Sequence, residues 1–191
     1  MKKSIIIMMI IAAIAGRGGL ALAASFPDVS DAKYAGAIDI LSELKVMIGD
    51  DAGLFRPGDT IRRSEFAAVA VRLAGIEDQL GDNTKPNFPD VSASHWAVAH
   101  INLAVANGYL VGDLEGTFRP DANLSVAEAA TILVRVVGHN ADALNNGGYP
   151  NGYVNTALDL GILENELTAA PRTAISRADV ALCAWNSLSV K

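Results

Sequence analysis

Residues 118–137 read FRPDANLSVAEAATILVRVV, a Phe-Arg-Pro loop followed by a helix-forming apolar run that ends at Gly138. The same pattern occurs earlier, where Phe55-Arg56-Pro57 opens a stretch that ends at Gly75. A weaker third version begins at Ser176-Arg177-Ala178-Asp179. The 191-residue chain is therefore predicted to be a repeat array, whose function depends on what the stacked copies build together.

The duplication covers whole structural units. Phe26-Pro27-Asp28-Val29-Ser30 recurs unchanged at residues 88–92, and aligning residues 26–75 with the later copy gives 19 identities over 50 positions. Ordinary composition would give roughly 3 or 4 identities by chance. We define repeat one as residues 26–76, repeat two as 88–139 and repeat three, which is degenerate, as 149–190. Residues 76–87 and 139–148 are interpreted as linkers.

Each repeat is predicted to contain two helices. The first has apolar residues at three- and four-residue steps, namely Ile38, Leu41, Leu44 and Ile48 in repeat one and Trp96, Ala99, Leu103, Ala106 and Leu110 in repeat two. The second is apolar over most of its surface and should be central. Ser125-x-x-Glu128 has the form of a capping box at its start, whereas repeat one has Arg62 at the cap position. We expect one all-α domain with six main helices, three of them packed centrally.

The N-terminal segment has the features of a secretory signal peptide. Lys2 and Lys3 precede an apolar run of about a dozen residues, which is too short to span a bilayer, and Ala21-Leu22-Ala23 has the form of a cleavage site. Residues 1–23 are therefore predicted to be removed, which changes the net charge from −6 to −9 because they hold three basic residues and no acid. Such an acidic chain is not expected to bind nucleic acid or an anionic membrane nonspecifically.

The sequence offers little support for catalysis or for a bound metal. Cys183 lies in an apolar run typical of a buried small hydrophobe, and as the one cysteine it permits no internal disulfide. His95 and His100 are five residues apart, which does not place them on one helical face as a zinc pair requires. The segment from Gly49 to Gly53 lacks the ligands of a calcium loop, so a turn is the better interpretation. We expect no enzyme activity, metal or cofactor.

These motifs resemble S-layer homology repeats. The resemblance is carried by Phe-Pro-Asp-Val, by Gly-Asp-x-x-Gly-x-Phe-Arg-Pro and by the Arg-Ser-Glu helix start, and it covers essentially all of the chain after residue 23. It is specific in repeats one and two and weak in repeat three. It implies three tandem two-helix repeats in a pseudo-threefold arrangement around a central three-helix bundle. It also implies noncovalent attachment to a secondary cell-wall polysaccharide, commonly one carrying pyruvate ketals, at the cell wall or S-layer of a Gram-positive-type bacterium.

The resemblance also points to ligand contacts. The arginine of the family's Thr-Arg-Ala-Glu signature falls on Arg63, Val126 and Arg177, so Arg63 and Arg177 are the main candidates, and valine cannot serve. An arginine offers a planar fork to a carboxylate, and the adjoining helix start is expected to add N–H donors. On this basis Arg63→Ala should weaken wall binding without unfolding the protein.

Three further residues are secondary candidates for polysaccharide contact: Trp96, Arg56 and Arg119. For Trp96 we prefer a place in the core. For the two arginines we prefer a structural role, in which they brace the loop against Glu65 and Glu128. Asp28 and Asp90 are expected to cap the first helix or its preceding turn. The alternative to a wall anchor is a structural or assembly protein whose grooves bind another surface protein.

Overall fold

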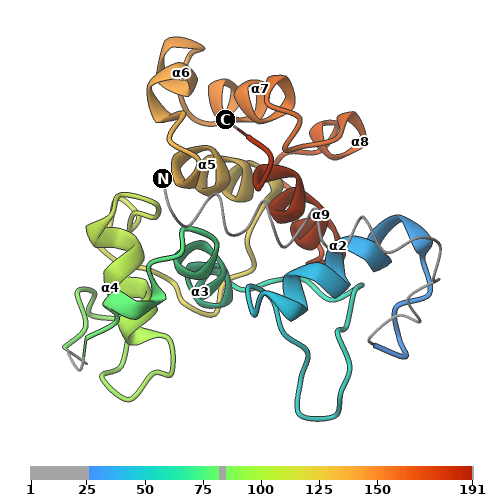
Figure 1. Ribbon diagram of the computed structural model, residues 1–191. Coiled ribbons are helices and arrows are strands. Elements are labelled where there is room, and N and C mark those ends of the chain that lie inside the picture. The colour runs from blue at the N-terminus through green and yellow to red at the C-terminus, as the bar shows by residue number, and fades with distance from the viewer. Residues whose placement is uncertain (1–25, 82–84, 191) are drawn as a thin grey trace.

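The computed structural model describes residues 26–81 and 85–190, so the predicted signal peptide lies outside the described residues. Within this part the protein consists of eight α-helices, one short 3-10 helix and connecting loops that meet only in isolated β-bridges (Figure 1). The predicted all-α class is confirmed. None of the helices in the described part is long and apolar enough to cross a membrane.

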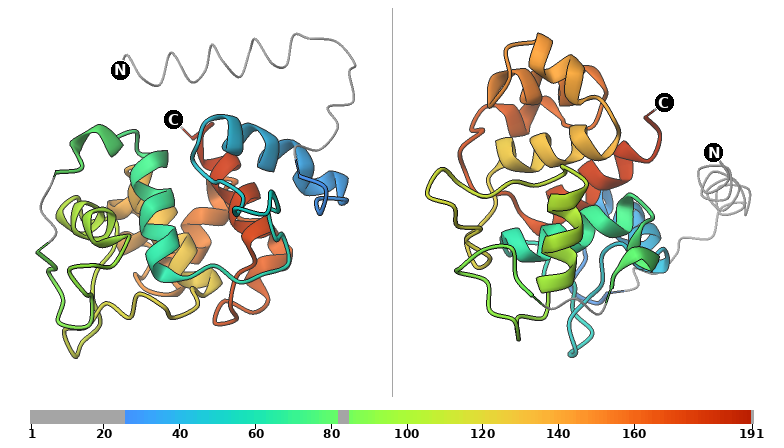
Figure 2. Two further views of the ribbon diagram at one scale, coloured as in Figure 1. Left: turned by 90° about the horizontal axis from the view of Figure 1, so that it is seen from below. Right: turned by 90° about the vertical axis from the view of Figure 1, so that its left-hand side faces the viewer.

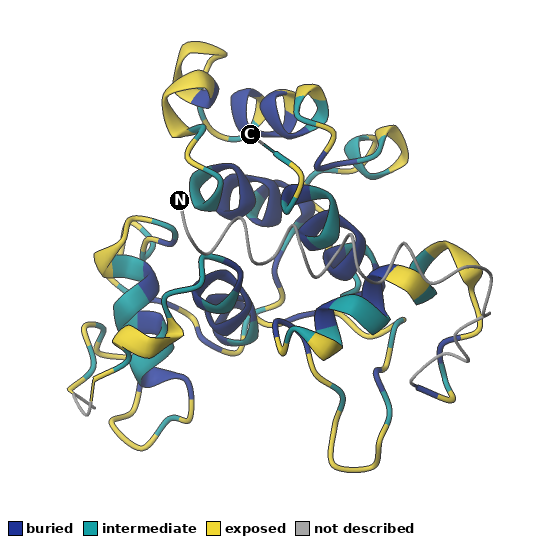
Figure 3. Ribbon diagram, in the orientation of Figure 1, coloured by how far each residue is buried: buried dark blue, intermediate teal, exposed yellow. Residues whose placement is uncertain are grey.

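The second helix of each repeat forms the centre of the molecule. These helices are α3 (Arg63–Leu73), α5 (Val126–Val136) and α9 (Arg177–Ser187). Most of their residues are buried, whereas the surrounding helices are buried mainly on one side (Figure 3). This agrees with apolar sequences that leave no polar face for solvent.

The first helix of each repeat lies outside this centre. These helices are α2 (Ala32–Glu43), α4 (Val98–Ala106) and α7 (Asn151–Asp159). The described part also contains three short elements, η1 (Glu77–Gln79), α6 (Asn140–Asn145) and α8 (Asn165–Thr168). The interpretation of residues 139–148 as a plain linker is therefore wrong. Ala143 of α6 is buried, and Asn140 accepts a hydrogen bond from the Tyr153 hydroxyl of α7 at 2.6 Å.

The main helix contacts join neighbouring repeats. α4 of repeat two packs on α3 of repeat one, α7 of repeat three packs on α5 of repeat two, and α2 of repeat one packs on α9 of repeat three. The views in Figure 2 show the last of these pairs, in blue and red, side by side. Each of these helix pairs thus joins two repeats, and the contact of α2 with α9 brings repeat one against repeat three.

A ring of backbone hydrogen bonds also joins the three repeats. The N–H of Ile61 donates to the Ile175 carbonyl at 3.3 Å, that of Ile175 to Leu124 at 2.9 Å, and that of Leu124 to Ile61 at 2.9 Å. The three residues are fully or almost fully buried just before α3, α5 and α9. The pseudo-threefold arrangement stays a prediction, and this cyclic pattern is what supports it.

The helix starts follow the expected capping chemistry. The Ser125 hydroxyl accepts the N–H of Glu128 at 3.3 Å while the Glu128 carboxylate accepts the N–H of Ser125 at 2.9 Å, which confirms the capping box. At α3 the Glu65 carboxylate accepts the N–H of Arg62 at 2.8 Å, but the Arg62 side chain makes no cap bond because it carries no acceptor. The start of α3 is thus less completely capped than the start of α5, as expected for repeat one.

Candidate functional site

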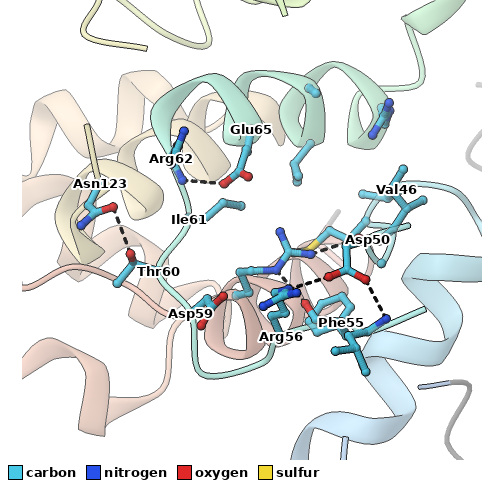
Figure 4. A pocket seen from close by; sticks show the side chains of 18 of the residues that line it. Val46, Asp50, Phe55, Arg56, Asp59, Thr60, Ile61, Arg62, Glu65 and Asn123 are labelled. Carbon is cyan, nitrogen blue, oxygen red and sulfur yellow. Dashed lines mark hydrogen bonds and ion pairs between the residues drawn. The ribbon is translucent and has the colours of Figure 1, made fainter. Parts of the chain in front are cut away.

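A groove with a volume of about 770 Å³ lies beside α3 and receives residues from all three repeats. We call it groove one. It is lined by four arginines and three acidic residues, together with Trp96 and Asn123 from repeat two and the loop that precedes α3. The charged residues are Arg56, Arg62, Arg72, Arg177, Asp50, Asp59 and Glu65. Figure 4 shows Asp50 and Arg56 on one side of this groove, with Arg62 and Glu65 at the start of α3. The lining has a net positive charge within an acidic protein.

The Phe-Arg-Pro loop of groove one is fixed by Asp28. Its carboxylate accepts the N–H of Phe55 at 3.0 Å and that of Arg56 at 2.7 Å, and Arg56 adopts the left-handed conformation with φ of 58°. Partial burial opposes ionisation of Asp28, but these N–H groups outweigh it and lower the pKa. A non-glycine residue rarely adopts this backbone conformation, so the two bonds hold a strained turn in place.

Repeat two uses the same device. The Asp90 carboxylate accepts the N–H of Phe118 at 2.9 Å and that of Arg119 at 2.6 Å. The expectation that Asp28 and Asp90 cap the first helix or its preceding turn is therefore wrong, because both carboxylates bind the later loop. In repeat one that role belongs to Asp31, which accepts the N–H of Lys33 at 2.9 Å.

The arginines of these loops pair with aspartates of the same loops. Arg56 Nε lies 2.6 Å from Asp50 Oδ2, and Arg119 Nε lies 3.1 Å from Asp113 Oδ2. The predicted bracing role is thus realised with other partners than Glu65 and Glu128. Arg56 lies in the lining of groove one, whereas Arg119 does not.

The Asp50 carboxylate also closes the turn that precedes the loop. It accepts the N–H groups of Leu54 at 3.0 Å and Ala52 at 2.9 Å, and these bonds together with Arg56 lower its pKa. The interpretation of this segment as a turn is confirmed. No group of three or more potential metal ligands occurs in the described part of the chain.

Arg63, a main candidate for ligand contact, is only 6% exposed and lies against repeat two. Its Nε donates to the Phe118 carbonyl at 2.8 Å, its Nη2 to the Val111 carbonyl at 3.0 Å, and its Nη1 to Glu128 at 3.0 Å. Burial lowers the pKa of Arg63 despite the neighbouring Glu128 carboxylate. All three guanidinium nitrogens are therefore engaged within the protein, and a carboxylate neutralises the charge.

Arg177, the other main candidate, has an equivalent position but different partners for its guanidinium group. Its Nε donates to the Phe55 carbonyl at 2.8 Å and its Nη2 to the Ile48 carbonyl at 3.0 Å. Among the described residues its Nη1 has no partner and no carboxylate forms an ion pair with it. Arg177 is half-buried in the lining of groove one, so it presents there a positive charge that no described carboxylate compensates at ion-pair distance.

The helix starts do not supply the N–H donors expected for a ligand. The N–H groups of Arg177 and Ala178 donate to the carbonyls of Asp59 at 2.8 Å and Pro57 at 3.0 Å. The N–H groups of Arg63 and Ser64 donate in the same way to the carbonyls of Ala122 and Pro120 in repeat two, each at 3.0 Å. That part of the prediction is wrong, because the neighbouring repeat already occupies these groups.

The valine at the signature position of repeat two is buried. Val126 is 2% exposed, and its N–H donates to the Thr173 carbonyl at 3.0 Å. The loop of repeat three is thus faced by a valine and not by an arginine equivalent to Arg63 or Arg177.

The Asp179 carboxylate at the start of α9 accepts a hydrogen bond from the Tyr34 hydroxyl at 2.9 Å.

Trp96 is 59% exposed and lies in the lining of groove one. The preference for a place in the core is therefore wrong. The ring stacks on His95 with centroids 6.0 Å apart and tilts against His100 at 6.2 Å. An exposed indole held in this way offers a flat apolar surface to a sugar ring.

Two lining arginines, Arg62 and Arg72, were not among the predicted site residues. Arg72 belongs to the last turn of α3, and its Nε donates to Glu77 at 2.8 Å. Arg62 bonds to Asp121 of repeat two at 3.0 Å. The sequence did contain one signal for Arg62, since this residue stands where the other two repeats have a serine cap.

Comparison with known proteins agrees with the repeat pattern. Residues 25–67 and 87–130 match the family model described as S-layer homology domain. A cell surface protein of Thermoanaerobacter kivui is 33% identical over 175 residues, which cover 90% of this chain and 22% of the relative. A surface layer protein of Brevibacillus choshinensis is 30% identical over 69% of this chain and 12% of its own length.

A cellulosome-anchoring protein of Acetivibrio thermocellus is 34% identical over 58% of this chain and 25% of its own length. The chain therefore spans a quarter or less of these three relatives. The family match and the relatives, which are surface proteins of Gram-positive bacteria, indicate a cell-wall location.

Proposed function

Since the chain belongs to the S-layer homology family, we propose that it anchors noncovalently to an anionic secondary cell-wall polysaccharide through groove one. A polymer that carries pyruvate ketals has the required chemistry, because each ketal presents a carboxylate. The chain corresponds to a small part of its relatives, so this proposal concerns the anchoring function of the repeats. Such anchoring needs no catalytic residue, and we propose no enzyme activity.

The single observation that carries this proposal is the uncompensated charge of Arg177. Its guanidinium is held by two carbonyls, which fix its direction but do not neutralise it. A carboxylate in the groove would complete the hydrogen bonding of Nη1 and pair with the charge in a partly desolvated position. Trp96 offers the neighbouring sugar ring a stacking surface.

Groove one is proposed as the principal site. Arg63, which faces the loop of repeat two, is buried and paired with Glu128, and Val126, which faces the loop of repeat three, stands where the other two repeats have an arginine. Neither of these positions offers a free guanidinium to an anion. Arg119 remains an exposed candidate at repeat two, but it is paired with Asp113.

Cosedimentation with cell-wall sacculi tests the proposal. Residues 24–191 should pellet with intact sacculi and stay in solution after the secondary polymer has been removed with acid. Binding that survives removal of the polymer, or a failure to bind intact walls, would contradict it.

The alternative is a groove that binds another surface protein. The loss of free arginines at repeats two and three favours it, because a protein that has changed its ligand need not retain them. It predicts no binding to intact sacculi, so the same experiment separates the two functions.

A further inference from the structure

We propose that Arg62 is a specificity-determining residue of groove one, which binds a second anionic group of the polysaccharide besides the group bound by Arg177. This inference depends on the proposed function and adds to it. It predicts a ligand whose repeating unit carries two separated negative charges, each a carboxylate or a phosphate.

The first argument is the position of Arg62 in the helix. Ser125 and Ser176 occupy the corresponding positions before α5 and α9, and each hydroxyl accepts the N–H of the third helical residue. Arg62 makes no such bond. A residue that breaks a local stability rule where the equivalent positions keep it is typical of a functional site.

The second argument is the availability of the Arg62 side chain. It lies in the lining of groove one and is 58% exposed. Its one hydrogen bond within the described residues joins Nη1 to Asp121 at 3.0 Å, and the Asp121 side chain is 72% exposed. Exposed ion pairs of this kind contribute little to stability, so a ligand can replace Asp121 or use the remaining N–H groups of Arg62.

The third argument is that different repeats hold the two arginines of the groove. Arg177 is held by the carbonyls of Ile48 and Phe55, in the loop of repeat one, whereas Arg62 is held from repeat two. Glu65 and Asp59 also belong to the lining and repel an anion (Figure 4). A ligand with two anionic groups, one for each arginine, fits a groove whose arginines are held from different repeats better than a ligand with a single group.

The test is the variant Arg62→Ser, with affinity and thermal stability measured in parallel. The wall polysaccharide is released and purified, and its binding to residues 24–191 is followed by titration calorimetry at several salt concentrations. We expect the variant to bind roughly 5- to 20-fold more weakly, with a smaller salt dependence, because it loses one charge-assisted contact. We expect its melting temperature to rise by about 2–4 °C, because serine restores the cap.

Two control variants distinguish this role from a change in net charge and from a structural ion pair. Arg172→Ser makes the same substitution at an exposed residue outside the groove lining and should leave the affinity unchanged. Asp121→Asn removes the partner of Arg62 and should maintain or increase the affinity. An equal loss in Arg172→Ser, or weaker binding in Asp121→Asn, would overturn the proposal.

Treatment of the polysaccharide with a phosphatase identifies the second group. If the affinity ratio of wild type to Arg62→Ser falls to one, the group is a phosphate monoester; if the ratio persists, the group is a carboxylate or a phosphodiester, neither of which a phosphatase removes. An Arg62→Ser variant with unchanged affinity and salt dependence would refute the role of Arg62 while leaving the proposed function intact. A wild-type protein that does not bind the polysaccharide would refute both.

Discussion

Arg177 lies over the ring of Phe55, a residue 122 positions earlier, with the guanidinium carbon 4.9 Å from the ring centroid. Arg63 lies in the same way over Phe118 at 5.0 Å. The two arginines therefore have the same local sequence position and the same aromatic support. They differ in charge compensation, because Glu128 pairs with Arg63 whereas no carboxylate of the described residues pairs with Arg177.

This difference predicts that two alanine variants affect different properties, Arg177→Ala the binding and Arg63→Ala the stability. Arg177→Ala should weaken binding to intact sacculi by about tenfold or more, because it removes the uncompensated charge of groove one. The protein should remain folded. Cosedimentation and circular dichroism of the same samples measure the two properties. Wild-type affinity in Arg177→Ala would contradict the assignment of the site.

Arg63→Ala should mainly affect stability. It removes three hydrogen bonds and leaves Glu128 without its partner at a mostly buried position, at a cost of about 3 kcal/mol in unfolding free energy. The structure thus changes the expectation from sequence, in which Arg63→Ala lowers binding with the fold intact. Urea titration measures the cost, and a loss below about 1 kcal/mol would show that the buried network contributes little.

A pair of glycine variants tests the packing of the loop in groove one. A Cβ atom at Gly49 would clash with the Phe26 ring and would lie 2.9 Å from the Leu54 carbonyl oxygen. Gly49→Ala should therefore destabilise the protein by about 1–3 kcal/mol.

Gly36 serves as the control, because it is exposed in the middle of α2 and a Cβ atom added there would meet no other atom within 4 Å. Gly36→Ala should stabilise the protein by roughly 0.5–1 kcal/mol, because glycine is a poor helix former. Urea titration of both variants measures the two effects, and a shift of the same sign in both would contradict the packing argument.

The capping box of α5 gives a third prediction. Ser125→Ala removes the hydroxyl that accepts the N–H of Glu128 and should lower the unfolding free energy by about 1 kcal/mol. Ser30→Ala, at an exposed residue with no side-chain hydrogen bond in the described part, should have almost no effect. Equal melting temperatures for the two variants would argue against the cap.

The loop aspartates predict a dependence of stability on pH. Hydrogen bonds from Thr117 lower the pKa of Asp113 from its ordinary value of 3.8. The pKa values of Asp28 and Asp50 are likewise lowered by hydrogen bonds within their own loop. A lowered pKa in the folded state means that the contribution to stability is complete above the ordinary value. This contribution to stability is lost as the pH falls through the lowered pKa of the folded state, so the loss should occur below about pH 4.

Comparison of the wild type with Asp113→Asn over pH 2–6 measures this contribution. The variant should melt at a lower temperature than the wild type at pH 6, and the difference should shrink as the pH falls below about 4. A difference that is constant over this range would show that the charge of Asp113 is not involved.

The helix positions could be predicted from the sequence because the apolar periodicity repeats. Residues 63–75 and 126–138 were expected to be central helices, and α3 and α5 occupy them. The pairing of helices across repeats could not be predicted, since α4 buries the same apolar face on α3 as it would on α5. Nor could α6, because six residues are too few to show a period.

The candidate site was only partly predictable for a similar reason. Arg63 and Arg177 look equivalent in sequence, and their difference depends on where one carboxylate, Glu128, points. The roles of Asp28 and Asp90 depend on contacts with loop residues 27 to 29 positions later in the chain. Local sequence rules do not describe such contacts, so these aspartates looked like helix caps.

The ring formed by Ile61, Leu124 and Ile175 has a consequence for the order in which the protein becomes active. Ile175 and Arg177 belong to repeat three, so the ring and groove one are completed only after all three repeats are available. If the chain is exported as predicted, starting from its N-terminus, it crosses the membrane without a finished groove. If groove one is the binding site as proposed, attachment to the wall then begins only once α9 has folded against α2.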